Sequence, residues 1–322
     1  MVTIRMVHRK SAVLSPSALA CLSRVPTINM TMGCVHGCLY CYTRGYRTYP
    51  GEGKVDVYEN ILEKLQAELQ RRKRKPDIVY FSPASDLFQP VFPVLDLAYE
   101  VIRSLLECGI GVAFLSKGTI PEKHMSLLQA HAGLVRAQIG LITLDSELLR
   151  TFEPNAAPAS VRVEQVKRLA DSGIKTQLRI DPILPAVTDD EQTFEELCRT
   201  AAECGVSQIA ASSLFLRPAP LRRLGTAAKS SPVVARCLAR FEASQRLAIH
   251  AEDSSVTALP TMERETAFRR LEVCATGHGL TVKRCSCKNP DIAKGTCSIA
   301  GEWQRQMAGS TQADFSGVLE GS

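Results

Sequence analysis

The sequence predicts an α/β fold built from repeated strand–helix units. Three stretches have the same form: a helix end, a glycine (Gly109, Gly173 or Gly205) and then a short apolar segment. A glycine at that point takes the left-handed conformation that ends many helices. Units of this kind are typical of parallel strands that are joined by crossover helices.

Hydrophobic patterning places six such units along the chain. We expect strands at 27–31, 77–81, 111–115, 135–141, 176–180 and 208–211, and helices at 55–72, 94–108, 122–130, 159–171, 190–204 and 232–249. A further helix is expected after these units, at 262–274. Residues 188–191 give the fifth helix a start that resembles a capping box. Six units fit either a barrel or an open doubly wound sheet, and periodicity alone does not decide between them.

Composition is that of an ordinary soluble enzyme. The 322 residues are 45% hydrophobic and 22% charged, and no apolar run approaches the roughly 20 residues that span a bilayer. Twelve cysteines without a secretory signal favour thiol chemistry in the cytoplasm, and no membrane partner is expected. The net charge of +6 permits nucleic-acid binding without requiring it. The highest local density of positive charge lies at 71–75. This segment is either the solvated end of a helix or a run that binds phosphate.

A cysteine triplet follows the first expected strand. Cys34, Cys38 and Cys41 form a CxxxCxxC motif. Three thiolates at this spacing can hold three irons of a 4Fe–4S cube and leave the fourth iron open to a ligand. Structural zinc would need a fourth ligand nearby, and a disulfide would leave one thiol over.

Polar residues cluster at the ends of the later strands as well. In parallel α/β folds the functional groups gather at the carboxyl ends of the strands, so these residues predict a single site. They are 82–86, Ser116, Lys117, Thr143, Asp145, Arg179 and Asp181.

The CxxxCxxC motif, with Tyr40 before the third cysteine, resembles the hallmark of the radical S-adenosylmethionine superfamily. The resemblance implies a partial (β/α)6 barrel and a 4Fe–4S cluster whose open iron binds S-adenosylmethionine. It further implies reductive cleavage to a 5′-deoxyadenosyl radical, with a reductant such as flavodoxin or ferredoxin. Tyr40 would lie against the adenine.

Further motifs are similar to the branch that includes spore photoproduct lyase. They are Ser85-Asp86, Phe114 to Lys117, Phe152 to Asn155 and Arg179 to Pro182. By this resemblance Lys117 contacts the carboxylate of S-adenosylmethionine, and Asp86, Thr143, Asp145 and Arg179 are further cofactor contacts. The alternative for each is hydrogen bonding within the barrel mouth. Pro83 occupies the position of the lyases' hydrogen-donating cysteine, so we expect a lyase-like relative with a different reaction.

A second group of cysteines lies near the C-terminus: Cys274, Cys285, Cys287 and Cys297. The segment around them has little capacity to pack a core, so we expect a metal to hold it, either a second 4Fe–4S cluster or zinc. The remaining cysteines of helical or apolar context are expected to be core residues: Cys21, Cys108, Cys198, Cys204 and Cys237.

These features divide the chain into an N-terminal extension (1–25), a barrel (26–252), a cysteine-rich segment (253–307) and a flexible tail (308–322). We expect an enzyme that acts on a nucleic acid or nucleotide, or on a peptide or small metabolite. The alternative is a non-catalytic, zinc- or cluster-stabilised protein that binds nucleic acid or senses redox state.

Overall fold

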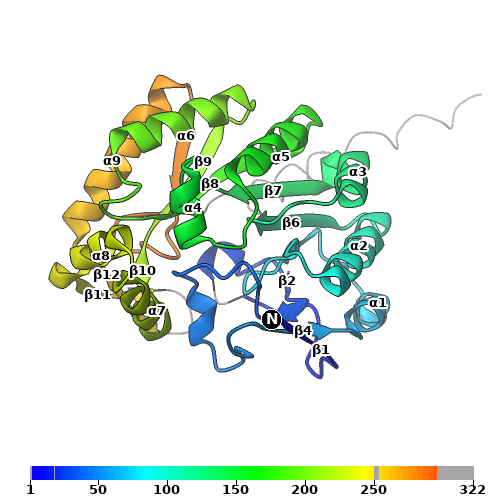
Figure 1. The fold of residues 1–322 in the computed structure, drawn as a ribbon. Helices are drawn as coiled ribbons and strands as arrows, with labels where there is room; N and C mark the ends of the chain where they lie inside the picture. Colours follow the sequence, from blue (N-terminus) through cyan, green and yellow to red (C-terminus); the bar gives the residue numbers. More distant parts are fainter. Residues whose placement is uncertain (1, 18, 250–253, 296–322) are drawn as a thin grey trace, which may run out of the picture.

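The computed structural model describes residues 2–17, 19–249 and 254–295, and its centre is a parallel sheet (Figure 1). Within these residues the strand order is β13-β9-β8-β7-β6-β5-β2, and every neighbouring pair is parallel. The strands are β2 (Thr27–Ile28), β5 (Ile78–Phe81), β6 (Gly111–Ser116), β7 (Val135–Gly140), β8 (Lys175–Ile183), β9 (Gln208–Ser213) and β13 (Thr281–Arg284). The expected strands at 77–81, 111–115, 135–141, 176–180 and 208–211 are therefore confirmed. The strand expected at 27–31 is corrected, because only Thr27–Ile28 pairs in this sheet and Thr31–Met32 pairs with residues 56–57 in another sheet. β13 is a further strand that the sequence patterns did not predict.

The sheet is curved and open, so the expected partial barrel is confirmed. β2 and β13 are its two edges and do not pair with each other. Helices cover the convex side of the arc (Figure 1). They are α1 (Ile61–Arg71), α2 (Phe92–Glu107), α3 (Glu122–Ala130), α5 (Ala159–Asp171), α6 (Glu191–Glu203) and α9 (Thr261–Gly277).

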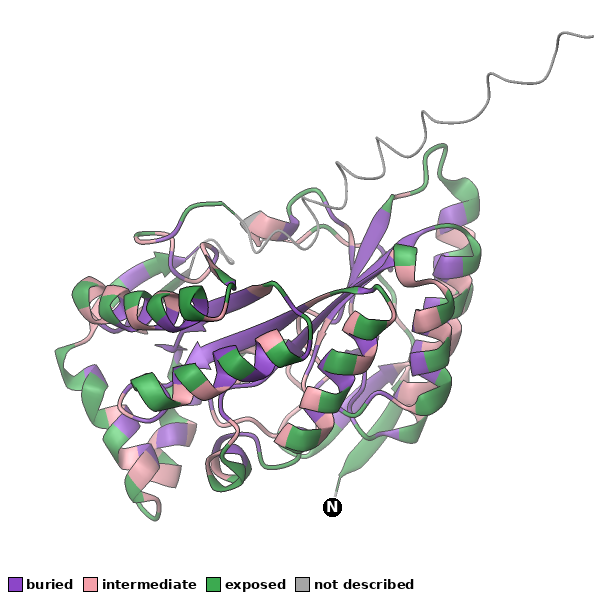
Figure 2. Cartoon of the chain, turned by 90° about the horizontal axis from the view of Figure 1, so that it is seen from above, coloured by how far each residue is buried: buried purple, intermediate pink, exposed green. Residues whose placement is uncertain are grey.

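Burial explains why these segments form this layer. All four residues of β5 and all six of β7 are buried, as expected for strands that are covered on both faces (Figure 2). In α2 the buried residues Val94, Ala98, Val101 and Leu105 recur at helical spacing and form one stripe toward the sheet.

Two small sheets complete the described chain. The first has the order β1-β4-β3, with β1 (Thr3–Val7), β3 (Thr31–Met32) and β4 (Lys54–Tyr58). The second has the order β10-β12-β11, with β10 (Phe215–Leu216), β11 (Gln245–Ile249) and β12 (Ser254–Ala258). Because β11 and β12 pair across it, the predicted domain boundary at 252/253 separates two strands of one sheet.

Two expected helices are corrected by these small sheets. The helix expected at 55–72 begins only at Ile61, because 54–58 is the β-strand that pairs with β1. The helix expected at 232–249 ends at Ala239 as α8 (Pro232–Ala239), because 245–249 pairs with β12. Two further helices were not predicted, α4 (Ser146–Phe152) and α7 (Pro218–Ala228). In the part of the chain described, no helix has both the length and the apolar character needed to cross a bilayer.

Candidate active site

The segment with the CxxxCxxC motif leaves β3 through a glycine that no other residue could replace without strain. Gly33 has φ +84°, and a Cβ built on it would lie 2.3 Å from the carbonyl oxygen of Lys54. The chain can therefore turn from the small N-terminal sheet into the barrel at this point.

The end of α4 holds this cysteine segment in place. The backbone N–H of Leu39 donates to Phe152 O at 2.9 Å. Asn155 donates from its backbone to His36 O at 3.1 Å and from its side-chain amide to Val35 O at 2.9 Å. The motif from Phe152 to Asn155 thus fixes the backbone of the cysteine segment through three hydrogen bonds.

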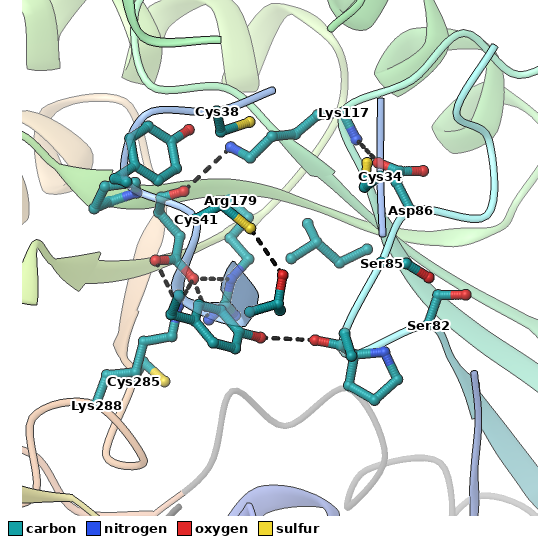
Figure 3. A pocket seen from close by; sticks show the side chains of 18 of the residues that line it. Cys34, Cys38, Cys41, Ser82, Ser85, Asp86, Lys117, Arg179, Cys285 and Lys288 are labelled. Carbon is teal, nitrogen blue, oxygen red and sulfur yellow. Dashed lines mark hydrogen bonds and ion pairs between the residues drawn. The ribbon is translucent and has the colours of Figure 1, made fainter. Parts of the chain in front are cut away.

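Cys34, Cys38 and Cys41, here called the first thiol triplet, line one pocket at the carboxyl ends of the strands (Figure 3). Burial raises the pKa of Cys34, and burial with the nearby Glu153 charge raises the pKa of Cys38 to about 12. Cys41 Sγ lies 3.0 Å from Thr43 Oγ1. Among the described residues no three His, Cys, Asp or Glu side chains are already arranged around a single metal ion. A cube bonds each thiolate to a different iron, so it does not need that arrangement.

Glu153 is the centre of a buried charge network beside the triplet. Its side chain is fully buried, and its oxygens accept hydrogen bonds from Lys117 Nζ at 2.9 Å, Arg162 Nη1 at 2.5 Å and the Tyr40 hydroxyl. Burial opposes ionisation of Glu153, but the cations of Lys117 and Arg162 outweigh it and lower its pKa to about 2. The network therefore fixes both Tyr40 and Lys117, two predicted cofactor residues.

Lys117 itself points into the pocket from the end of β6. Its Nζ donates to Glu153 and to Asp181 O at 3.1 Å, and it lies 5.7 Å from the centre of the Tyr40 ring. Gly140 makes room for it, because a Cβ at that position would lie 2.9 Å from both Cγ and Nζ of Lys117.

Asp86 lines the pocket, but its carboxylate is engaged in holding neighbouring loops. It accepts hydrogen bonds from Ser116 Oγ at 2.8 Å, from the Lys117 backbone at 2.7 Å and from the Phe88 backbone at 2.8 Å. His36 Nδ1 lies 3.5 Å away. Asp86 thus joins the loop after β5 to the end of β6, and a cofactor contact by it remains a prediction.

Thr143 and Asp145 are not among the residues that line this pocket. Asp145 caps α4 by accepting hydrogen bonds from the Glu147 and Leu148 backbones at 2.7 and 3.0 Å. Thr143 Oγ1 accepts from the Asp145 backbone at 3.1 Å. Both side chains therefore have local structural roles, and the structure does not bring them to the other predicted cofactor residues.

A second ion-pair group lies in the pocket lining at the end of β8. Asp181 accepts from Arg179 Nε at 2.9 Å and from Lys288 Nζ at 2.6 and 2.8 Å (Figure 3). Burial opposes ionisation of Asp181, but Lys288 and Arg179 outweigh it and hold its pKa below the ordinary range. From its place directly after Cys287, Lys288 was expected to offset the charge of the C-terminal thiolates, but its ion pair with Asp181 in this pocket was not predicted.

Three buried polar atoms in the pocket lining have no hydrogen-bond partner among the described residues: Ser82 Oγ, His36 Nε2 and Arg44 Nε. Ser82 is 4% exposed and has φ 51°, an uncommon value for a residue with a side chain. The carbonyl oxygen of the next residue, Pro83, accepts a hydrogen bond from the Tyr42 hydroxyl at 2.7 Å. Unpaired buried polar atoms are costly, so a polar ligand such as S-adenosylmethionine fits this pocket.

The C-terminal cysteines that were predicted to share one metal lie in different parts of the structure. Cys285 and Cys287 line the pocket, whereas Cys274 lies in α9 with its Sγ 3.9 Å from Glu191 O, packed within the hydrophobic core. Cys297 lies outside the described residues. The ligand set expected for this group is thereby corrected for Cys274, because α9 packs on α6 on the convex side of the sheet.

The structure confirms the prediction of a core position for some of the remaining cysteines and contradicts it for others. Cys198, Cys204 and Cys237 are buried, as predicted. Cys108 is exposed at the end of α2, so that prediction was wrong. Cys21 is only partly buried and lines the pocket, so it too was wrongly assigned to the core.

Comparison with known proteins gives a family match over more than half of the chain. The model of the Radical SAM superfamily matches residues 28–200. An uncharacterized protein of Mycobacterium tuberculosis is 26% identical over 225 residues, which cover 67% of this chain and 66% of that protein. The chain thus spans slightly less than two thirds of the length of this relative. A radical SAM Nalpha-GlyT isomerase of Pseudomonas phage M6 is 26% identical over 195 residues, 59% of this chain and 40% of the isomerase.

Solved structures match over most of the described fold. Spore photoproduct lyase in complex with a dinucleoside spore photoproduct has a TM-score of 0.64 at 16% identity, covering 88% of this chain and 82% of the lyase chain. A mutant of such a lyase with bound AdoMet and dinucleoside spore photoproduct has a TM-score of 0.64 at 17% identity, covering 87% and 81%. At this identity the likeness is one of fold.

Proposed function

Because the chain belongs to the radical S-adenosylmethionine superfamily, we propose that it is an enzyme that cleaves S-adenosylmethionine reductively and acts on a base or nucleotide of nucleic acid. The first thiol triplet would hold a 4Fe–4S cluster, which when bound supplies the electron for the cleavage. The observation that carries the proposal is that the triplet shares one pocket with the strand-end residues Lys117, Asp86 and Arg179. The electron would come from a reductant such as flavodoxin or ferredoxin.

The charge network gives Lys117 a specific task. An ammonium group has three N–H donors, and in the part of the chain described two of them are used, toward Glu153 and the Asp181 carbonyl. The third can bind the carboxylate of S-adenosylmethionine. Glu153 holds the ammonium in place through this hydrogen bond, so it acts as a positioning residue.

Other lining residues would bind the remaining parts of the cofactor. Ser82 Oγ and His36 Nε2 would each gain a hydrogen-bond partner from a polar ligand. The Tyr40 ring, held through its hydroxyl by Glu153, would lie against the adenine. Arg179 would touch the cofactor from the end of β8.

Aromatic side chains in the pocket support a nucleobase as substrate. Tyr42, Tyr80 and Phe215 line it, and the Tyr42 and Phe215 rings lie 6.4 Å apart. Rings of this kind stack on bases. The names of the relatives agree, since the lyases bind a dinucleoside photoproduct and the phage protein is a Nalpha-GlyT isomerase.

The reaction is proposed to differ from that of the lyases. Pro83 stands where the lyases have a hydrogen-donating cysteine and cannot donate hydrogen, so we propose a different outcome for the substrate radical.

The basic run at 71–75 lies far from the pocket along the strand direction. It directly precedes β5, at the amino ends of the strands, whereas the pocket lies at their carboxyl ends. Substrate binding would therefore depend on the pocket wall and not on this run.

Formation of 5′-deoxyadenosine tests the activity. The protein is purified without oxygen, reconstituted with iron and sulfide, and supplied with S-adenosylmethionine and dithionite. We expect 5′-deoxyadenosine from the wild type and from Cys108→Ala, the exposed control cysteine, and none from Cys34→Ala, Cys38→Ala or Cys41→Ala. Equal cleavage in all five proteins would refute the assignment of the triplet, and a cluster-loaded wild type without cleavage would favour the non-catalytic alternative.

The substrate class has its own test. We expect single-stranded or double-stranded DNA or RNA to raise the rate of 5′-deoxyadenosine formation, and binding of that nucleic acid to weaken steeply with salt. Stimulation by peptides or by a fraction of small metabolites, with no effect of nucleic acid, would assign the substrate to the other class.

A further inference from the structure

Three cysteines from opposite ends of the chain meet in the wall of the pocket. Cys21 lies in a short 3-10 helix (Ala20–Leu22), and Cys285 and Cys287 directly follow β13. The Cys21 backbone N–H donates to Cys287 Sγ at 3.3 Å, and Cys21, Cys285 and Cys287 all line the same pocket. These residues are here called the second thiol triplet.

The backbone around the second triplet is held by the barrel. The Cys285 N–H donates to Ala211 O at 2.8 Å and so continues the pairing of β13 with β9. Its carbonyl accepts the Asn289 backbone N–H at 3.0 Å and the Asn289 amide at 3.1 Å, which closes a turn around Cys287. Asn289 is 1% exposed and also donates to Ser212 Oγ at 3.3 Å. The backbone that carries Cys285 and Cys287 is therefore held in place by the sheet and by Asn289.

The number and surroundings of the thiols argue against simpler roles. Cys285 and Cys287 are 4% and 2% exposed. A disulfide would leave the third thiol over. Among the described residues no three His, Cys, Asp or Glu side chains, these thiols included, surround a single metal ion as a zinc site requires, whereas a cube bonds each thiolate to a different iron. Arg179 and Lys288 line the same pocket, and their positive charges would offset those of metal-bound thiolates.

We infer that Cys21, Cys285 and Cys287 hold a second iron–sulfur cluster, in the wall of the pocket that also contains the first thiol triplet. Thiolates are soft ligands that select such clusters, and three of them would leave one iron of a 4Fe–4S cube without a cysteine ligand. Cys21 takes the place that sequence patterns gave to Cys274. The inference does not depend on the proposed reaction.

Metal content in a protein without the first cluster tests this inference. In a full-length chain carrying Cys34→Ala, Cys38→Ala and Cys41→Ala, anaerobic reconstitution should give roughly four irons and four sulfides per chain. Adding Cys21→Ala, Cys285→Ala or Cys287→Ala should reduce the iron at least fivefold. Adding Cys274→Ala or Cys108→Ala should leave it unchanged.

Several results would overturn the inference: no iron in the triple variant, full iron after Cys21→Ala, or stoichiometric zinc in its place. Cysteine-to-serine variants and circular dichroism separate ligand loss from misfolding, because serine keeps the volume of the side chain. Since the first cluster is absent from every protein in this series, a failure of the proposed reaction would leave these iron contents as they are.

Discussion

Replacement of Glu153 by glutamine tests the charge network beside the first triplet. Glutamine keeps the size of the side chain but removes the negative charge that lies between Lys117 and Arg162. The Arg162 side chain is 0% exposed and would keep its hydrogen bonds to the Ala157 and Gly140 carbonyls at 2.7 and 2.9 Å. Its charge, however, would lose the carboxylate that compensates it.

Two independent estimates of the loss in the free energy of unfolding agree for Glu153→Gln. Removing one partner of a buried ion pair costs about 3–5 kcal/mol of stability. A pKa of about 2, against the ordinary value of 4.5, corresponds to about 3 kcal/mol of differential stabilisation of the ionised form. We therefore expect the free energy of unfolding to fall by about 3 kcal/mol.

Urea denaturation of the metal-free protein, followed by circular dichroism, measures this loss as a lower midpoint at unchanged slope. Glu147→Gln is the matched control, because Glu147 lies in α4, the helix that Glu153 directly follows, and its side chain is 87% exposed. This change should alter stability by less than about 0.5 kcal/mol. A loss below about 1 kcal/mol for Glu153→Gln would refute the reasoning, since the carboxylate would then not be needed to compensate the buried cations.

Three further predictions concern the same residues. Gly140→Ala should push the Lys117 side chain from its place and weaken S-adenosylmethionine binding several-fold, as measured by calorimetry, whereas Gly133→Ala, with nothing within 4 Å of its Cβ, should not. Lys117→Met should raise the Kd for S-adenosylmethionine about 10- to 100-fold, the value of a charged hydrogen bond, and an unchanged Kd would exclude it as the carboxylate contact. Because the pKa of Glu153 is lowered on folding, its contribution is complete above about pH 4.5 and is lost as the pH falls toward about 2, so acid titration of stability should be steeper in that window for the wild type than for Glu153→Gln. Equal slopes would contradict the lowered pKa.

Much of the fold was accessible from local sequence signals. The glycines at 109, 173 and 205 all have positive φ at helix ends, as predicted, and each precedes a strand of the parallel sheet. The errors fall where pairing with another strand decides. Residues 54–58 form a strand because β1, far away in the sequence, lies beside them, and residues 245–249 form a strand because they pair with β12, the next strand along the chain. Local periodicity does not contain that information.

The site was predictable in part for the same reason. The first triplet, Lys117 and Arg179 lie at strand ends, where parallel α/β topology gathers functional groups, and the structure places them in one pocket. The sequence also drew attention to the motif from Phe152 to Asn155, but not to the role of Glu153, which depends on the contact of α4 with the cysteine segment.

What the sequence by itself determined was the six-unit parallel arrangement and the motif that places this chain among the radical S-adenosylmethionine proteins, because spacing along one segment is a local property. The tertiary structure alone decided the composition of the second triplet. Cys21 and Cys287 are 266 positions apart and meet only because the N-terminal segment and β13 both reach the pocket wall. Cys274, much closer to Cys285 in sequence, points instead into the packing between α9 and α6, since a helix fixes which way each of its side chains faces.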